Sequence, residues 1–155
     1  MSLLPTAKRE TGSRLSSETL HANCVALDGR AVLITGISGS GKSDLSLRLI
    51  DRGFTLVADD QVIIRKTDGK LVASAPPTTL GKLEIRGVGI VTMDTVTDIP
   101  VVLLVELTSD IQRLPDENRE RPLLGVTLPL ISVDSLTASA ASKVALALDR
   151  LGLPA

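Results

Sequence analysis

The chain contains one segment with the spacing of a phosphate-binding P-loop, Gly36-Ile37-Ser38-Gly39-Ser40-Gly41-Lys42-Ser43. Glycines in such a segment let the backbone turn so that its N–H groups form a nest for anions. The Lys42 ammonium suits β- and γ-phosphates, and the Ser43 hydroxyl suits Mg²⁺. We therefore predict a nucleotide phosphate site built from Gly36, Ser38, Gly39, Ser40, Gly41, Lys42 and Ser43.

A glycine-rich turn that only joins a strand to a helix is the alternative interpretation of this segment. The flanking sequence favours the P-loop, because an apolar run at residues 31–35 precedes it and predicts a buried strand. Residues 44–51 follow with Leu45 and Leu49 at helical spacing, and Gly53 is a helix stop signal. A strand before and a helix after are what a P-loop requires, so we expect a nucleotide-using phosphotransferase.

Two adjacent carboxylates, Asp59 and Asp60, end the next apolar run, residues 56–58. A P-loop enzyme needs a further carboxylate at the end of a neighbouring strand, as a Mg²⁺ ligand or as a base. Neighbouring strand residues point to opposite faces, so only one of the two is expected to face the phosphates directly. One carboxylate on the metal and one beside a substrate hydroxyl is chemically reasonable. An ordinary acidic turn is the alternative.

Glu84 and Arg86 fall in an alternating segment, residues 83–91, and we expect them to share one face of a strand. A Mg²⁺ ligand beside a phosphate-binding arginine fits such a pair. Taken by themselves, the two residues favour a surface ion pair of little energetic value. His21, the single histidine, is by itself better interpreted as a surface strand residue.

The elements that must position these residues are mostly strands. Strand-like runs at residues 19–27 and 31–35 are joined by an Asp-Gly turn, and a second hairpin signal lies at residues 67–70. Residues 136–151 predict the second helix, with Asp134 or Ser135 as its N-cap, and residues 110–122 predict a surface loop or short helix. The remaining predicted strands are residues 55–58, 62–65, 71–75, 83–91, 100–107 and 128–133.

This element count predicts an α/β fold, a strand-rich P-loop domain with few helices packed on a mixed sheet. The chain has 155 residues, which favours one domain. Residues 1–17 are polar and predict a flexible N-terminal arm, and residues 18–155 form the predicted P-loop catalytic domain.

Composition excludes several classes of function. The net charge is −1 and the only aromatic residue is one Phe, so neither a basic footprint nor stacking rings for nucleic acid are present. A single cysteine, Cys24, leaves no internal disulfide and suits a reducing compartment. No apolar run approaches the roughly 18 residues of a membrane span, and the first residues lack a signal-peptide core. We expect a cytoplasmic protein without a nucleic-acid partner.

Four segments in this order resemble HPr kinase/phosphorylase, which phosphorylates a serine of the phosphocarrier protein HPr. They are Leu20-His21, the P-loop with its continuation to Gly53, Leu56-Val57-Ala58-Asp59-Asp60, and Leu83-Glu84-Ile85-Arg86-Gly87-Val88-Gly89-Ile90. The last is the most specific. The resemblance covers residue 20 to the C-terminal helix and implies a short form consisting of the catalytic domain alone. It also implies a fold shared with phosphoenolpyruvate carboxykinases, assembly into hexamers, ATP and Mg²⁺ as cofactors, and a role in regulating carbon metabolism through the phosphotransferase system.

The resemblance also implies roles for residues at matching positions. Asp60 is implied to be the general base for the target serine, Lys42 to hold phosphate, and His21 to be an active-site histidine. Ser43 and Glu84 are implied as Mg²⁺ ligands, and Asp59 is our further metal candidate.

An active-site arginine lies in a mobile loop of the family, and Arg113 is its best match here, with Arg119 and Arg121 as less favoured alternatives. The family also has an arginine- and glycine-rich loop tied to phosphorolysis before its last helix. Residues 131–137 occupy that place and contain no arginine, so the forward kinase reaction is better supported than its reversal.

The sequence therefore predicts an ATP- and Mg²⁺-dependent protein serine kinase acting on HPr or a close paralogue. A small-molecule P-loop kinase and a non-enzymatic nucleotide-binding regulator are the alternative functions.

Overall fold

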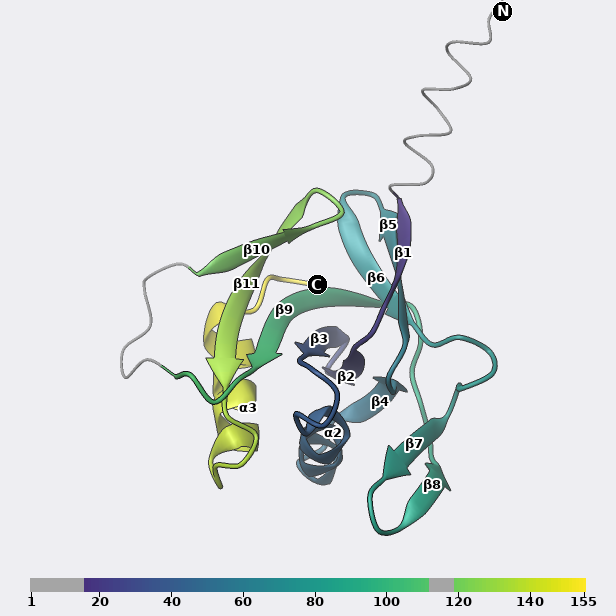
Figure 1. Cartoon of the computed structure of the whole chain (residues 1–155). Coiled ribbons are helices and arrows are strands. Elements are labelled where there is room, and N and C mark those ends of the chain that lie inside the picture. Colours follow the sequence, from purple (N-terminus) through teal and green to yellow (C-terminus); the bar gives the residue numbers. More distant parts are fainter. Residues whose placement is uncertain (1–15, 112–118) are drawn as a thin grey trace, which may run out of the picture.

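The structure is a computed structural model, and it describes residues 16–111 and 119–155. Its main element is a nine-stranded mixed sheet, shown in Figure 1. The path through the sheet runs β1 (Ser17–Leu20), β5 (Val62–Thr67), β6 (Lys70–Ser74), β9 (Ile99–Leu107), β3 (Arg30–Thr35), β2 (Asn23–Leu27) and β4 (Thr55–Ala58). At its branch, β11 (Val126–Val133) pairs parallel with β9 and antiparallel with β10 (Glu120–Leu123). β3 and β9 are also parallel.

The strands at the centre are buried on both faces, which explains their nearly continuous apolar runs. In β3, Val32 and Ile34 join a core cluster with the helices, whereas Ala31 and Leu33 join a second cluster made with other strands. This is the two-residue alternation of a strand. Both clusters are aliphatic except for Phe54 in the first and Cys24 in the second, as the composition requires.

In the described part of the chain, the helices α2 (Lys42–Asp51) and α3 (Ala140–Leu151) lie on one side of the sheet (Figure 1). Leu45 and Leu49 of α2 pack into the helix-side cluster, which confirms the predicted helix after the P-loop. Gly53 follows at φ 101°, the left-handed conformation that ends many helices.

The second helix begins at Ala140, so the predicted start at residue 136 with a cap at Asp134 or Ser135 was wrong. Asp134 Oδ1 instead accepts the N–H of Leu136, and Thr137 N–H donates to the Asp134 carbonyl. Such local side-chain bonds offer the backbone a turn in place of a helix.

Two predicted strands are each divided in the structure. The run at residues 19–27 breaks at His21 and Ala22, because the Ala22 N–H donates to the Asp60 carbonyl rather than to a neighbouring strand. The run at residues 83–91 is the hairpin of β7 (Lys82–Ile85) and β8 (Gly89–Thr92). Arg86 therefore lies in the turn after β7, and the prediction that it shares a strand face with Glu84 was wrong.

The α/β fold with few helices on a mixed, strand-rich sheet is confirmed. The predicted loop or short helix at residues 110–122 ends in a strand, since β10 begins at Glu120, while residues 112–118 lie outside the described part. Most of the predicted arm, residues 1–15, also lies outside it, and β1 begins at Ser17. No helix in the described residues is long and apolar enough to cross a membrane.

Candidate phosphate-binding and catalytic site

The P-loop lies between the end of β3 and the start of α2, with two glycines at points of close approach. Gly41 has φ 97°, which disfavours any side chain, and a Cβ there would lie 2.6 Å from the Ser135 hydroxyl oxygen. A Cβ at Gly36 would lie 2.5 Å from the Ser40 hydroxyl oxygen. The loop is therefore compact, and a side chain at either position would have to displace a serine hydroxyl.

Lys42 turns back into the loop that precedes it. Its Nζ donates to the carbonyl oxygens of Gly36, at 2.8 Å, and of Ile37, at 3.1 Å. Only 7% of the residue is exposed. A largely buried lysine beside a helix N-terminus, where the helix dipole also favours anions, has the features of a phosphate-binding site.

Asp59, at the end of β4, is 8% exposed and accepts three hydrogen bonds. Its Oδ1 receives the Ser43 hydroxyl at 2.7 Å and the Asn23 side-chain amide at 2.6 Å. Its Oδ2 receives the backbone N–H of Glu84 at 3.0 Å. The carboxylate is thus held against the first turn of α2.

Asp60 differs from its neighbour in exposure and in backbone conformation. Its side chain is 65% exposed, and its Oδ1 lies 3.4 Å from Nε2 of His21. Its backbone has φ 68°, a left-handed conformation uncommon outside glycine, although aspartate tolerates it better than most residues. The acidic pair therefore presents one buried carboxylate to the P-loop helix and one exposed carboxylate to solvent and to a histidine.

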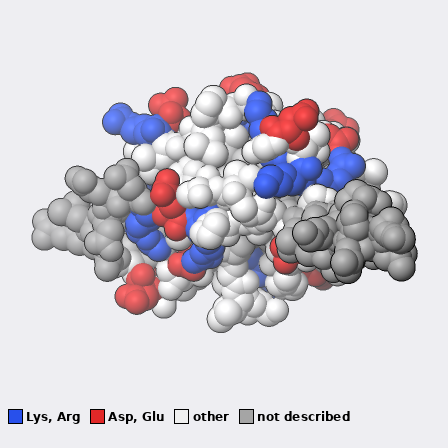
Figure 2. All heavy atoms as spheres, turned by 90° about the horizontal axis from the view of Figure 1, so that it is seen from above, with Lys and Arg blue, Asp and Glu red and all other residues white. Residues whose placement is uncertain are grey.

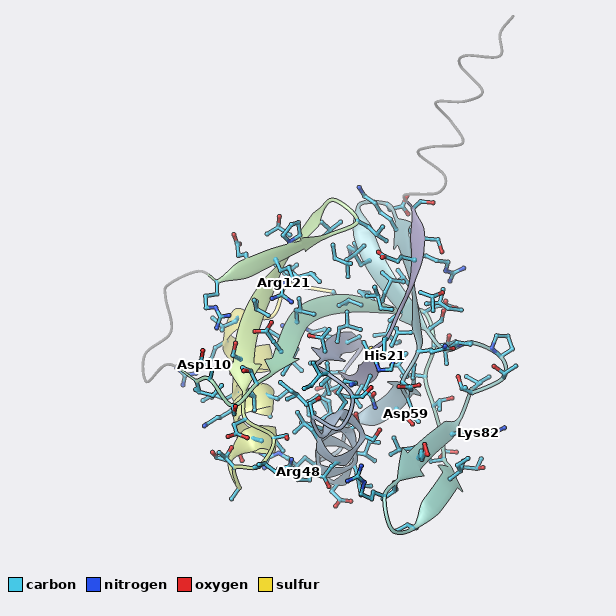
Figure 3. The ribbon with its side chains drawn as sticks, in the orientation of Figure 1. His21, Arg48, Asp59, Lys82, Asp110 and Arg121 are labelled. Atoms are coloured by element: carbon cyan, nitrogen blue, oxygen red, sulfur yellow. The ribbon has the colours of Figure 1, made fainter. Side chains whose placement is uncertain are left out.

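Figure 3 shows His21 and Asp59 close together at the centre of the molecule, beside α2, with Arg121 further towards β10 and β11. Glu84 belongs to the site through its backbone, and its side chain is exposed on β7. Arg113 lies outside the described residues. The structure thus brings His21, Lys42, Ser43, Asp59, Asp60 and the backbone of Glu84 to one edge of the sheet.

The two alternative arginines, Arg119 and Arg121, both form ion pairs with Glu106 near the end of β9. Glu106 is paired with Thr35 at the end of β3, the strand that leads into the P-loop. Arg121 approaches Glu106 Oε2 at 2.9 Å, and Ser132 joins Glu106 to Arg119. The pKa of Glu106 lies below its ordinary value, mainly because Arg121 donates a hydrogen bond to the carboxylate. Desolvation by burial acts in the opposite direction and raises the pKa.

Sequence reasoning missed Glu106 and Asn23. Glu106 could have been noticed as a carboxylate in the most apolar run of the chain, and Asn23 as an amide at the start of an apolar strand. Both signals are weak, because neither residue belongs to a chemical motif.

The donor groups present fit a magnesium ion. Mg²⁺ is usually held by one or two protein oxygens together with waters and substrate phosphates rather than by an all-protein cage. The Ser43 hydroxyl and the Asp59 carboxylate meet this need, because they adjoin each other beside the P-loop. Among the described residues no three His, Cys, Asp or Glu side chains gather into a metal-binding group.

The surface seen in Figure 2 mixes basic and acidic side chains. This agrees with the net charge of −1, and no single basic face stands out in that view.

The family model described as HPr Serine kinase C-terminal domain matches residues 13–146, a range that includes all four segments of the resemblance. HPr kinase/phosphorylase of Clostridium botulinum (strain Eklund 17B / Type B) is 38% identical over 133 residues, covering 77% of this chain and 44% of that protein. The Clostridium tetani protein of the same name is 47% identical over 91 residues, covering 58% and 30%. The chain thus spans less than half the length of these relatives.

A solved structure titled "Structure of the Hpr(Ser) kinase/phosphatase from Coxiella burnetii" is similar with a TM-score of 0.75 and 30% sequence identity. The similarity covers 86% of this chain and 95% of that chain.

Proposed function

The chain belongs to the HPr serine kinase C-terminal domain family, and from this premise we propose that it transfers the γ-phosphoryl group of ATP to a serine of HPr or a close paralogue. The main support for the proposal is the different exposure of the two adjacent aspartates beside the P-loop. Asp59 is buried against Ser43, whereas the Asp60 side chain is exposed beside His21. An exposed base suits an acceptor hydroxyl carried by another protein better than a small molecule enclosed in a pocket.

The residues have distinct chemical tasks in this reaction. Asp60 accepts the proton of the serine hydroxyl, whose oxygen then forms a bond to the γ-phosphorus while the bond to the β,γ-bridging oxygen breaks. Lys42 and the P-loop N–H groups stabilise the charge on the phosphates. His21, 3.4 Å from Asp60, orients that carboxylate. Arg113 remains the proposed mobile-loop arginine.

We propose Mg²⁺ as the metal, held by Ser43 and Asp59, with Glu84 as a further ligand. When bound, it would neutralise charge on the β- and γ-phosphates. Ser43 and Asp59 would serve as ligands of the ion, and the buried Asn23 would keep Asp59 in place.

The test is transfer of label from ATP to HPr in the presence of Mg²⁺, for the wild type, Asp60→Asn and Asp68→Asn. Both aspartates are exposed and left-handed, at φ 68° and 52°, and asparagine tolerates this conformation. The two variants therefore make the same chemical change in a similar backbone conformation, one in the candidate site and one outside it. We expect label on HPr with the wild type and Asp68→Asn, and a loss of at least about a hundredfold with Asp60→Asn, since a general base contributes roughly 10² to 10⁴ in rate.

The alternative functions give other results. Transfer of label to an added small-molecule acceptor but not to HPr would indicate a small-molecule kinase, and ATP binding without any transfer would indicate a regulator. Incubating phosphorylated HPr with inorganic phosphate tests whether the protein also removes the phosphoryl group by phosphorolysis.

We also propose a cytoplasmic location and a homo-oligomer, a hexamer by resemblance to the family. The free, buried thiol of Cys24 supports a reducing compartment. Light scattering of the purified protein measures the oligomer, and a monomer mass would contradict that part of the proposal.

A further inference from the structure

Asn23 is a buried amide at the first position of β2, with 1% of its surface exposed. The rest of that strand is apolar, so the amide is out of keeping with its surroundings. A buried amide is costly unless its donors and acceptor find partners. The Asn23 side chain has three partners: the Asp59 carboxylate and the Asp60 backbone of the candidate site, and the Ser46 hydroxyl of α2.

The geometry of these contacts defines the orientation of the amide. Nδ2 donates to Asp59 Oδ1 at 2.6 Å and to Ser46 Oγ at 3.2 Å, which uses both of its hydrogens. Oδ1 accepts the N–H of Asp60 at 3.1 Å. The reverse orientation would set a carbonyl oxygen against a carboxylate and an NH₂ group against an N–H, so only one orientation is compatible with the network.

The second contact bears on the left-handed backbone of Asp60. Its N–H is held by the Asn23 side chain, and its carbonyl oxygen accepts the N–H of Ala22 at 3.1 Å. Two consecutive residues of one chain segment thus hold both sides of Asp60. A left-handed non-glycine residue persists where its surroundings hold it in that conformation, as they do here.

The third contact reaches the P-loop. Ser46, which accepts from Asn23, donates its own hydroxyl hydrogen to the Lys42 carbonyl oxygen at 2.9 Å. One side chain of β2 therefore connects the end of β4 to the first turn of α2.

We propose that Asn23 is a positioning residue for phosphoryl transfer: it directs the Asp59 carboxylate towards Ser43 and fixes the backbone from which Asp60 meets the acceptor hydroxyl. This inference rests on the proposed function. Asn23 itself touches neither the phosphates nor the acceptor, and it acts through the two aspartates.

The chemistry explains why an amide stands here. Leucine fills a similar volume but supplies no donor to Asp59 and no acceptor to Asp60. Aspartate would place a second carboxylate beside Asp59, where like charges repel. Serine or threonine is too short to bridge both aspartates and would preserve the network only in part.

The experiment compares Asn23→Leu, Asn23→Thr and the control Val25→Ala by steady-state kinetics with ATP, Mg²⁺ and HPr. Val25 is a fully buried residue of the same strand that packs towards the helices, so its truncation lowers stability without touching the amide. We expect Asn23→Leu to lower kcat about a hundredfold, the size of effect that misplacing a catalytic group produces. The KM for HPr and the affinity for metal-free ATP should stay within about twofold, because Lys42 and the P-loop keep their own contacts.

A second measurement needs no acceptor. Binding of Mn²⁺ to the protein–ATP complex, followed by electron paramagnetic resonance, should weaken roughly tenfold or more in Asn23→Leu, as expected when a residue that orients a metal ligand is removed. Asn23→Thr should lie between Asn23→Leu and the wild type in both measurements. If Asn23→Leu does not fold, Asn23→Thr alone is compared with the wild type.

Several outcomes would overturn the inference. One is a kcat of Asn23→Leu within about threefold of wild type. Another is a loss of metal-free ATP binding in Asn23→Leu as large as its loss of Mn²⁺ binding. The third is a fall of kcat in Val25→Ala as large as in Asn23→Leu, which would indicate a general effect on stability. If the wild type does not label HPr, the proposed function fails, and the Mn²⁺ measurement still decides whether Asn23 positions Asp59.

Discussion

The hydroxyl of Ser43 donates a 2.7 Å hydrogen bond to the carboxylate of Asp59, so the first turn of α2 and the end of β4 meet at one point. The two side chains are 16 positions apart in sequence. Their contact makes the P-loop and the acidic strand end parts of a single site, with one hydroxyl and one carboxylate side by side.

This contact predicts a metal-specific defect in Ser43→Ala. Loss of the hydroxyl removes a proposed Mg²⁺ ligand and one of the donors to Asp59, while Lys42 and the loop N–H groups remain. We expect ATP affinity in the presence of Mg²⁺ to fall about tenfold or more, with little change for metal-free ATP. Calorimetric titrations with and without Mg²⁺ measure this. Ser43→Thr, which keeps a hydroxyl, is the control, and equal losses under both conditions would contradict a metal role.

Gly41→Ala tests the compactness of the P-loop. The φ of 97° is strained for alanine, and the new Cβ would meet the Ser135 hydroxyl, which itself donates to the Ser40 carbonyl. We expect a loss of stability of about 1 kcal/mol or more together with a strong loss of ATP binding. Gly29→Ala is a matched control, because Gly29 has φ 76° and open space at its Cβ. It should lose stability and keep ATP binding, and the same ATP affinity in both variants would contradict the prediction.

The parts of the site that could be predicted from sequence are those with local signals. The strand ending at Thr35, the P-loop and the helix with Leu45 and Leu49 follow from apolar spacing and glycines within one stretch of chain. The Asp59–Asp60 pair could also be predicted, because a strand end is visible in the sequence.

The parts that could not be predicted depend on contacts between distant residues. The break before β2 results from the bond between the Ala22 N–H and the Asp60 carbonyl. The burial of Asn23 follows from its two aspartate partners just after β4. Arg86 leaves the strand because a turn begins after Ile85, and alternation alone does not reveal where a ladder ends.

The thiol of Cys24 is expected to be protected from chemical reagents in the folded protein. Burial raises the pKa of Cys24, and the side chain is fully enclosed, so neither a thiolate nor access for a reagent is available in the folded state. We expect no reaction with an aromatic disulfide reagent in native buffer and complete reaction in guanidinium chloride. Under mildly denaturing conditions, ATP with Mg²⁺ should slow the reaction, because a ligand of the folded state stabilises it. Labelling at the rate of a small model thiol in native buffer would contradict the burial.

The ionised Glu106 is expected to contribute to the free energy of unfolding in a pH-dependent way. Arg121, by its hydrogen bond and then its charge, lowers the folded-state pKa of Glu106 from the ordinary 4.5, and Arg119 adds to this. A lowered folded-state pKa means that the ionised group stabilises the fold above the unfolded-state pKa and that this contribution is lost as the pH falls through the folded-state pKa. Because the side chain is a third exposed, at 33%, the contribution is discounted to about 1 kcal/mol or less.

We therefore expect Glu106→Gln to be less stable than the wild type at neutral pH, with the difference shrinking on acidification through the pH region below the ordinary pKa of 4.5. Urea unfolding at neutral and at acidic pH measures the difference. Glu18→Gln, which changes an exposed carboxylate on β1 in the same way, is the control and should not reproduce the loss of stability at neutral pH. A difference that grows on acidification would mean that the ionised Glu106 destabilises the fold, because the two arginines would then fail to offset its desolvation.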